Sequence, residues 1–231
     1  KNKIKGNVRF IFQPAEEKGG GARYMIKDGC LDHVDEIFGV HLWNYEPFGI
    51  VGSVPGPMMA STDTIHIRVH GTGGHGGVPQ GTVDAVVASA HLISCLQTIV
   101  SRSLDPVETA VLTIGTIHGG NNYNVIADTV EMEGTIRTFS KKVRQRIKER
   151  ATEIAKGIQE AFNAAIEVKL EPGYPSTVNH KVSFEKFMKA ASAIVGDGAR
   201  QLPPFLGGED FSYYLKEIPG CFFFVGSSPP N

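Results

Sequence analysis

The sequence contains little cysteine. Its 231 residues include only Cys30, Cys95 and Cys221, and no two of these are spaced as Cys-x-x-Cys. An odd number of cysteines without that spacing argues against a disulfide scaffold and against a zinc knuckle. We therefore expect a reducing, cytoplasmic environment, in which each cysteine is a small buried hydrophobic residue rather than a nucleophile.

The sequence also lacks an excess of charge of either sign and a long apolar run. Lys and Arg number 23 and Asp and Glu 24, which gives a formal net charge of −1. This balance favours neither a polyanion nor an anionic membrane surface, so we expect no binding to nucleic acid or to membrane. No apolar run reaches the length of about 18 residues that a membrane span needs, and the first residues lack the core of a signal peptide.

The first part of the chain alternates between strand and helix patterns. Val8 to Gln13 predicts a buried strand, Gly21 to Asp28 a short helix closed by Gly29, and Glu36 to His41 a second strand. A strand, helix, strand unit makes its two strands parallel. With 41% hydrophobic residues, the chain can fill the core of one large domain or of two ordinary ones.

Two adjacent acids follow the first predicted strand, and a histidine closes the second. In parallel sheets, sites lie beyond the carboxyl ends of the strands, where Glu16, Glu17 and His41 all fall. Neighbouring side chains in extended backbone point opposite ways, so Glu17 can bind an ion with His41 while Glu16 faces a water as general base. A solvated acid pair beside a hydrogen-bonded histidine fits the same spacing, and the spacing alone does not decide between them.

A stretch rich in glycine and proline, Gly49 to Ser61, indicates a domain boundary near Thr62. Strand, helix, strand, strand, helix, strand is the order that follows, which is the ferredoxin-like βαββαβ arrangement with two helices on one face of a small sheet. The predicted elements are a strand at Thr64 to His70, a helix at Thr82 to Ser101, strands at Thr109 to His118 and Thr129 to Phe139, a helix from the cap Ser140 to Asn163, and a strand at Ile166 to Leu170.

The last part of the chain is predicted to return to the first sheet. A helix near Val182 to Val195 and a short helix from Asp210 precede the apolar run Cys221 to Val225. A run without polar interruption is typical of a strand covered on both faces. We assign it to the first domain, so that the small domain is an insertion.

Basic residues cluster on the predicted helix that begins at Ser140. They interleave with Val143 and Ile147 of its apolar face, which favours a solvated helix face over a contact with nucleic acid. The six are Lys141, Lys142, Arg144, Arg146, Lys148 and Arg150.

Six short motifs give the chain a family resemblance. They are Gln13-Pro14-Ala15-Glu16-Glu17, Gly39-Val40-His41, Gly73-Gly74-His75-Gly76-Gly77-Val78-Pro79, Asn124-Val125-Ile126-Ala127-Asp128, Gly134-Thr135-Ile136-Arg137-Thr138 and Gly208-Glu209-Asp210-Phe211. In this order, and over nearly the whole chain, they resemble the M20 metallopeptidase family. The amidohydrolase branch, with hippurate hydrolases, N-acyl-amino-acid amidohydrolases and auxin-conjugate hydrolases, is the most similar.

The resemblance implies a mixed α/β fold of two domains. One is a partial catalytic domain with a mainly parallel sheet, formed by residues 1–62 and 175–231. The other is an inserted ferredoxin-like lid, residues 63–174, which serves as a dimerisation surface, so that a homodimer is expected. The family carries two metal ions on the catalytic domain, and carboxylate and imidazole ligands suit zinc, manganese, cobalt or nickel.

The resemblance also implies roles for the residues of the acid doublet and its histidine. Glu16 matches the general base of the family, and Glu17 and His41 match metal ligands. Two ions about 3.5 to 4 Å apart would activate a water and polarise the scissile carbonyl. Glu16 would take the proton of the water and pass it to the leaving amine.

Three residues of the predicted lid match substrate-contacting positions. His75 matches a histidine that reaches the oxyanion, often in the site of the partner subunit, and Asn124 and Arg137 match residues that hold the substrate. Arg137 would bind an amino-acid carboxylate through paired hydrogen bonds. Structural roles remain open, since Asn124 also suits a turn and Arg137 a surface strand. The glycines around His75 do not form a phosphate loop, because neither Gly-Lys-Ser nor Gly-Lys-Thr follows them.

The sequence also departs from the family pattern. It has no Cys-Gly-His-Asp-x-His segment before Val8 and no late histidine, so it holds at most two of roughly five ligands, and it opens on Lys1 rather than methionine. We expect a fragment trimmed at both ends, with exposed edges or apolar patches, that alone binds metal weakly and hydrolyses nothing. Glu209 and Asp210 are interpreted as helix-capping or supporting acids rather than catalytic residues.

The leading hypothesis is a metal-dependent amidohydrolase that releases an amino acid from an N-acyl or N-aroyl amino acid. A catalytically silent lid or binding module of the same fold is one alternative. A di- or aminopeptidase on the same scaffold is another. The parent chain and a substrate panel would separate the three.

Overall fold

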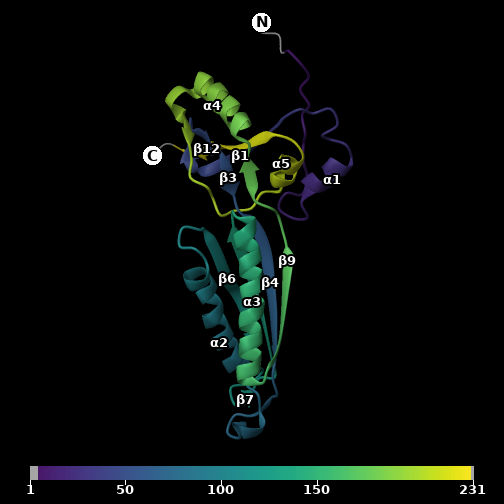
Figure 1. Cartoon of the computed structure of the whole chain (residues 1–231), viewed down its shortest axis with the longest axis vertical. Helices are drawn as coiled ribbons and strands as arrows, with labels where there is room; N and C mark the ends of the chain where they lie inside the picture. Colours follow the sequence, from purple (N-terminus) through teal and green to yellow (C-terminus); the bar gives the residue numbers. More distant parts are fainter. Residues whose placement is uncertain (1–4, 230–231) are drawn as a thin grey trace. The chain divides into compact units, whose positions relative to one another are not determined.

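The computed structural model describes residues 5–229. The chain divides into two compact units (Figure 1). Unit 1 comprises Lys1–Ala60 and Tyr174–Asn231, and unit 2 is the continuous segment Ser61–Gly173. Unit 2 is therefore an insertion in unit 1, and its limits lie close to the predicted boundaries at residues 62 and 174.

Unit 1 combines short strands with three helices of the α type. Its elements are α1 (Gly21–Lys27), β1 (Ile37–Pro47), β2 (Val51–Ser53), β3 (Gly56–Met59), β10 (Thr177–Asn179), α4 (Lys181–Val195), the 3-10 turn η3 (Gly196–Gly198), β11 (Ala199–Gln201), the 3-10 turn η4 (Asp210–Tyr213), α5 (Tyr214–Glu217) and β12 (Gly220–Ser228). Strands β1, β12, β2 and β11 form one mixed sheet in that order, and β10 pairs with β3.

Strand β12 is the centre of unit 1. It runs parallel to β1, with Ile37 opposite Gly220, and antiparallel to β2. Cys221 faces α4 and packs with Phe184 and Phe187, whereas Phe222 and Phe224 face the cluster that holds Phe211 and Tyr214 of the η4 and α5 segment. Both faces of β12 are thus covered, which explains its apolar sequence, and the predicted assignment of this strand to the first domain is confirmed.

The predicted strand Val8 to Gln13 is wrong. In the described residues this segment forms no strand, and Phe10 and Phe12 are 79% and 88% exposed. An apolar run becomes a strand only when a neighbour pairs with its backbone, and β1 pairs with β12 alone. The predicted parallel pairing of this segment with β1 is therefore absent as well.

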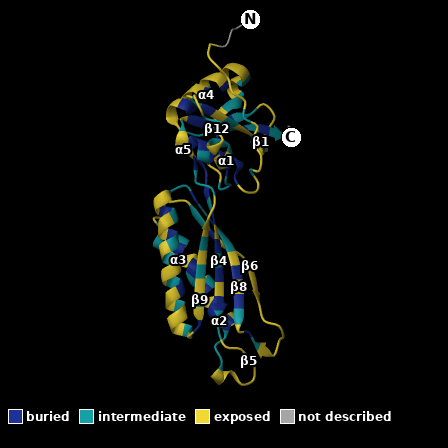
Figure 2. Cartoon of the chain, turned by 90° about the vertical axis from the view of Figure 1, so that its right-hand side faces the viewer, coloured by how far each residue is buried: buried dark blue, intermediate teal, exposed yellow. Residues whose placement is uncertain are grey.

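Strand β1 is an edge strand with an exposed apolar face. Phe38, Val40 and Leu42 alternate along it and are all exposed, Leu42 by 69%. Together with Phe10 and Phe12 they leave several apolar side chains exposed on unit 1, whose exposed residues are drawn in yellow in Figure 2. The exposed edges and apolar patches expected from the sequence are therefore present.

Unit 2 follows the predicted order of strands and helices. Its elements are β4 (Ser61–His70), β5 (Gly74–His75), the 3-10 turn η1 (Pro79–Gly81), α2 (Ala85–Thr98), the π-helical turn η2 (Ile99–Ser103), β6 (Ala110–Gly119), β7 (Val125–Ile126), β8 (Thr129–Thr138), α3 (Lys141–Phe162) and β9 (Ala165–Pro172). Strands β6, β8, β4 and β9 form an antiparallel sheet in that order, and β5 pairs with β7.

The two faces of this sheet differ in polarity, as the alternation in the sequence predicts. Ile65, Ile67 and Val69 point to one face and pack with Leu92 of α2 and Ile147 of α3. Helices α2 and α3 both cover that face (Figure 1). The apolar side chains that recur every second residue in β4 and once per turn in α3 therefore pack together in one core.

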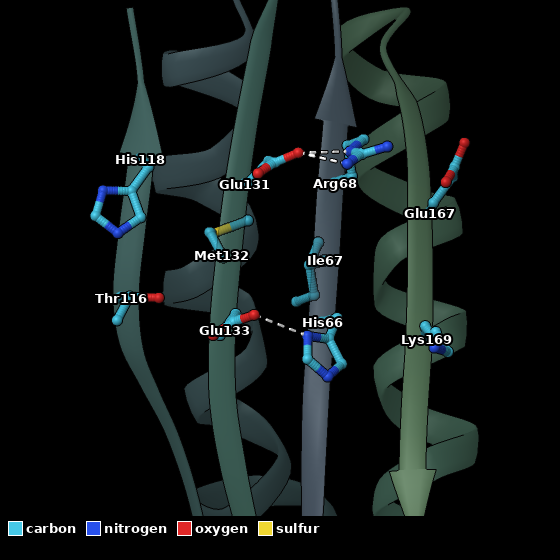
Figure 3. A pocket seen from close by; sticks show the side chains of 10 residues that line it. All are labelled: His66, Ile67, Arg68, Thr116, His118, Glu131, Met132, Glu133, Glu167 and Lys169. Atoms are coloured by element: carbon cyan, nitrogen blue, oxygen red, sulfur yellow. Dashed lines mark hydrogen bonds and ion pairs between the residues drawn. The ribbon is translucent and has the colours of Figure 1, made fainter.

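The opposite face of the sheet is polar. Arg68 donates from Nε to Glu131 Oε1 at 2.9 Å, and His66 Nδ1 lies 3.1 Å from Glu133 Oε1 (Figure 3). These side chains border a hollow of about 460 Å³. These acidic and basic side chains pair across neighbouring strands, and such cross-strand pairs stabilise the sheet. Their arrangement is therefore explained without a ligand.

The basic cluster on α3 is only partly a solvated face. Arg144 donates from Nε and Nη2 to the two carboxylate oxygens of Asp63, each at 2.6 Å, and Lys148 Nζ lies 3.5 Å from the same carboxylate. Asp63 is buried on the helix side of β4. Ser140 caps α3 as predicted, since its Oγ accepts a hydrogen bond from the N–H of Val143 at 3.3 Å.

One helical stretch of the described chain, Ala85–Ser103, is long and apolar enough to span a membrane by length and composition. In this fold it packs against the sheet of unit 2, where Leu92, Leu96 and Ile99 are fully buried. Its apolar character is thus accounted for by the core.

Candidate active site

The loop that carries the acid doublet is held in an unusual conformation. Ala15 has a φ of 59°, a left-handed value that is unfavourable for a residue with a side chain, and Gly19 and Gly20 also have positive φ. The N–H of Gly20 donates to the carbonyl of Ala15 at 3.1 Å, and the hydroxyl of Tyr174 donates to the carbonyl of Glu16. In this geometry the side chain of Glu16 is half-buried within unit 1, whereas that of Glu17 is exposed.

Glycine is required where this loop closes. A Cβ on Gly21 would lie 1.8 Å from the carbonyl oxygen of Pro14. The backbone can approach that closely only without a side chain, so the glycine run after the acid doublet serves the turn into α1.

Glu16 meets two acids from a distant part of the chain. A carboxylate oxygen of Glu16, one of Glu209 and one of Asp210 all lie within 4.8 Å of one another. Glu209 caps η4, because its Oε1 accepts from the N–H of Phe211 at 3.2 Å. Glu209 and Asp210 are both buried and Glu16 is half-buried, so three carboxyl groups converge at a site largely shielded from solvent.

Burial and mutual repulsion raise the pKa of two of these acids. The pKa of Glu209 rises to about 8, mainly because burial disfavours its charged form and because Glu16 and Asp210 add negative charge nearby. Burial, followed by the charges of Glu17 and Asp210, raises the pKa of Glu16, while His41 lowers it. Glu209 is therefore largely a neutral acid at pH 7.

His41 lies near this group, but not at the end of a strand. Strand β1 continues to Pro47, with His41 opposite Phe224, so the predicted strand end at His41 is wrong. The ladder with β12 extends past His41 because Trp43 packs on Phe224 with ring centroids 4.0 Å apart. His41 Nδ1 is 2.5 Å from the carbonyl of Leu42, which fixes the ring and leaves Nε2 as the atom that can bind an ion.

The structure brings His75 and Asn124 together. His75 of β5 pairs with Val125 of β7, and the N–H of Gly76 donates to the carbonyl of Asn124 at 2.8 Å. The N–H of Gly77 donates to His75 Nδ1 at 3.0 Å, so that Nε2 carries the ring proton and can donate it to a ligand. A Cβ on Gly76 would lie 3.0 Å from the carbonyl oxygen of Asn124, a tight contact that a larger residue would relieve only by a small shift of the backbone.

Arg137 lies on the four-stranded sheet, at the end away from His75 and Asn124. It is opposite Thr62 near the end of β8, whereas the separate two-stranded sheet of β5 and β7 lies beyond the start of β8 (Figure 2). Ten residues of β8 at about 3.3 Å each separate the two ends by roughly 30 Å. Burial lowers the pKa of Arg137, and Asp63 partly offsets this effect.

The sequence reasoning missed the part that Gln13, Asp210 and Tyr174 play around Glu16. Glu209 caps η4 as predicted, but Asp210 does not cap this turn. Its two oxygens instead accept hydrogen bonds from Gln13 Nε2 and from the N–H of Ala22. Two adjacent acids after Gly207-Gly208 were the only local signal for this contact.

Comparisons with known proteins show the family to which the chain is similar. The profile described as Peptidase family M20/M25/M40 matches residues 1–231. The chain is 40% identical to the N-acetyl-L-cysteine deacetylase of Bacillus subtilis, over 97% of the chain and 54% of that protein. It is 41% identical to thermostable carboxypeptidase 2 of Saccharolobus solfataricus, over 98% of the chain and 58% of that protein.

A solved structure shows the same fold. The YxeP protein of Bacillus subtilis, described as a dinuclear metal binding peptidase from the M20 family, superposes with a TM-score of 0.76 and 35% identity. The match covers 95% of this chain and 56% of that one, and the chain spans a little over half the length of the curated relatives named above. The chain belongs to peptidase family M20/M25/M40.

Proposed function

We propose that the chain contributes part of the catalytic domain and the ferredoxin-like lid of a cytoplasmic, metal-dependent amidohydrolase. Its substrates would be N-acyl or N-aroyl amino acids, whose amide bond is cleaved by water. The observation that carries this proposal is the half-buried Glu16, with a raised pKa, on a loop beside exposed Glu17 and near His41. The deacetylase similarity supports the acyl amino acid as substrate class.

The donor atoms suit a divalent ion in part. Glu17 and Nε2 of His41 would bind it, and the description of YxeP supports two ions in the whole protein. Both oxygens of Asp210 already accept protein N–H groups, so Asp210 is not counted as a ligand. When bound, a divalent ion lowers the pKa of water and polarises a carbonyl. Zinc, manganese, cobalt and nickel all match these ligands.

Glu16 would act as the proton carrier. The pKa of Glu16 is raised toward neutral pH. A general base accepts and returns a proton most efficiently when its pKa lies near the pH of the reaction. The carboxylate would take a proton from the attacking water and deliver it to the leaving amine. Neutral Glu209 beside it avoids a third buried negative charge at neutral pH.

The lid would hold the substrate and its oxyanion. His75 would donate from Nε2 to the oxyanion, since its Nδ1 accepts from Gly77. Asn124, next to it, would bind the substrate, and Arg137 would pair with the amino-acid carboxylate. His75 lies beyond one end of the four-stranded sheet and Arg137 near the other end, roughly 30 Å away, so one lid cannot present both to one small substrate.

A homodimer would bring both groups to one substrate. In it, one subunit would supply Arg137 and its partner would supply His75 and Asn124. Strand β6 is an unpaired edge of the described sheet, and α2 beside it carries no charged residue from Ala85 to Thr98. An uncharged helix next to an open strand edge suits association with a second copy.

Two alternatives remain as candidate functions. The similarity to a carboxypeptidase favours a peptidase on the same scaffold. A catalytically silent lid or binding module is favoured by the small number of ligands, because Glu17 and His41 are the two predicted ligands that the described residues offer near Glu16. Both alternatives predict that N-acyl amino acids are not hydrolysed.

A substrate panel tests the proposal. The product of the complete reading frame that encodes this chain would be loaded with each of the four metals. N-acetyl and N-benzoyl amino acids would be compared with dipeptides, and amino acid release would be measured. We expect release from the acyl substrates, and none from the 231 residues alone, which should bind metal weakly. Cleavage of dipeptides only, or of nothing, would contradict the proposal.

A further inference from the structure

Asp210 joins the two ends of the loop that carries Glu16. It is fully buried, and both of its oxygens accept hydrogen bonds from this loop. Oδ1 accepts from Gln13 Nε2 at 2.5 Å, and Oδ2 accepts from the N–H of Ala22 at 3.0 Å. One carboxylate from a segment nearly 200 residues away thus holds Gln13, which precedes the acid doublet, and Ala22, which follows it in α1.

The loop needs such support because its backbone is strained. Ala15, the residue before Glu16, has the left-handed φ of 59°. Strained residues persist only where surrounding contacts determine them, and they cluster at functional sites. The N–H of Gly20 donates to the carbonyl of Ala15 within the loop, and the hydroxyl of Tyr174 donates to the carbonyl of Glu16 from outside it. Asp210 adds the two contacts that anchor the loop at its ends.

Asp210 also replaces a missing helix cap. Helix α1 begins after Gly20, which has no side chain to cap it. Ala22 is the second residue of α1, and its N–H is one that an N-cap side chain ordinarily accepts. The carboxylate of Asp210 makes this bond instead, and its negative charge is favourable at the start of a helix. The direction of α1, and so the end of the loop, depends on it.

We propose that Asp210 is a positioning residue for the hydrolytic reaction, because its carboxylate clips both ends of the loop 13–22 and thereby fixes Glu16. The proposal rests on the proposed function of Glu16 as general base. Asp210 itself touches neither substrate nor water in this role. A displaced base loses rate rather than substrate affinity, so the loss is expected in kcat while KM changes little.

The reciprocal exchange of the two side chains provides the sharpest variants. In Asp210→Asn the charge of the acceptor is lost. The new amide oxygen still accepts from Ala22, and the Gln13 amide can turn to accept from the new amide, so two charge-assisted hydrogen bonds become weaker neutral ones. In Asp210→Asn combined with Gln13→Glu, the introduced amide donates to the introduced carboxylate. Its oxygen still accepts from Ala22, and the net charge is that of the wild type. Asp105→Asn is the matched control, because Asp105 also accepts a backbone N–H, from Val107, but in a turn of unit 2.

Two readouts are measured on the product of the complete reading frame. Hydrogen exchange followed by mass spectrometry reports the loop 13–22, and steady-state kinetics report kcat and KM. For Asp210→Asn we expect about tenfold faster exchange in the loop, because two charge-assisted hydrogen bonds become neutral, and kcat lower by about 10- to 100-fold. The reciprocal pair should restore both quantities, and Asp105→Asn should change neither.

The outcomes separate this inference from the proposed function. Unchanged loop exchange in Asp210→Asn would overturn the clip, whatever the activity. Faster exchange with unchanged kcat, or kcat that the reciprocal pair fails to raise, would overturn the positioning role. If Asp210→Asn does not fold, Gln13→Met removes one arm alone and must still speed exchange. Wild-type protein that hydrolyses no N-acyl amino acid would instead refute the proposed function of Glu16.

Discussion

Replacing Glu209 with glutamine should make the stability of unit 1 less sensitive to pH. Folding raises the pKa of Glu209 from its usual 4.5 to about 8, chiefly through burial. Between pH 4.5 and about pH 8, Glu209 therefore keeps its proton in the folded protein and loses it in the unfolded chain. The stability that neutral Glu209 contributes is complete below pH 4.5 and is lost as the pH rises to about 8.

The size of this effect follows from the interval between the two pKa values. Each pH unit is worth ~1.36 kcal/mol, so the wild type should lose up to roughly 4 kcal/mol between pH 5 and pH 8 from this residue. In Glu209→Gln the side chain is neutral at every pH, and its oxygen can still accept from the N–H of Phe211. The variant should therefore gain stability relative to the wild type as the pH rises.

Urea unfolding of the 231-residue chain, in the presence of a chelator, measures this difference. The chain has one tryptophan, Trp43, which stacks on Phe224, so fluorescence reports unit 1. Glu185→Gln, at an exposed position of α4, is the matched control and should show no such trend. A free energy difference between Glu209→Gln and wild type that is the same at pH 5 and pH 8 would refute the argument.

Two further predictions concern unit 2. Asp63→Asn should destabilise unit 2 by about 3 kcal/mol in urea unfolding followed by circular dichroism, because Arg144 would lose its buried partner. Glu131→Gln, which breaks an exposed pair, should cost less than about 1 kcal/mol, and equal effects would contradict the distinction. His75→Ala in the product of the complete reading frame should lower kcat by about 10²- to 10³-fold, without a change in melting temperature. An unchanged kcat would contradict the inference that His75 donates a hydrogen bond to the oxyanion.

The elements of unit 2 could be predicted from local sequence. Ile65, Ile67 and Val69 alternate with polar residues, and the apolar positions of α3 follow the helical period. The observed limits of β6, β8 and α3 each lie within one residue of the predicted ones, because each period identifies its own element without long-range information. The ends of strands could not always be predicted. Strand β1, for example, continues beyond His41 to Pro47.

The sequence could not predict contacts between distant segments. Val8 to Gln13 has the composition of a buried strand, but strand formation depends on a neighbour that no local pattern specifies. The bond between Gln13 and Asp210 joins residues 197 positions apart. The separation of His75 from Arg137 depends likewise on sheet register, which only the fold reveals.

The central claim is that Glu16 is the general base of a metal-dependent amidohydrolase. Its most direct test is kcat for an N-acyl amino acid with Glu16→Gln in the product of the complete reading frame, alongside the bound metal content. We expect kcat to fall by about 10²- to 10⁴-fold while the metal content is that of the wild type, because Glu17 and His41 are intact. A variant with wild-type kcat would contradict the claim.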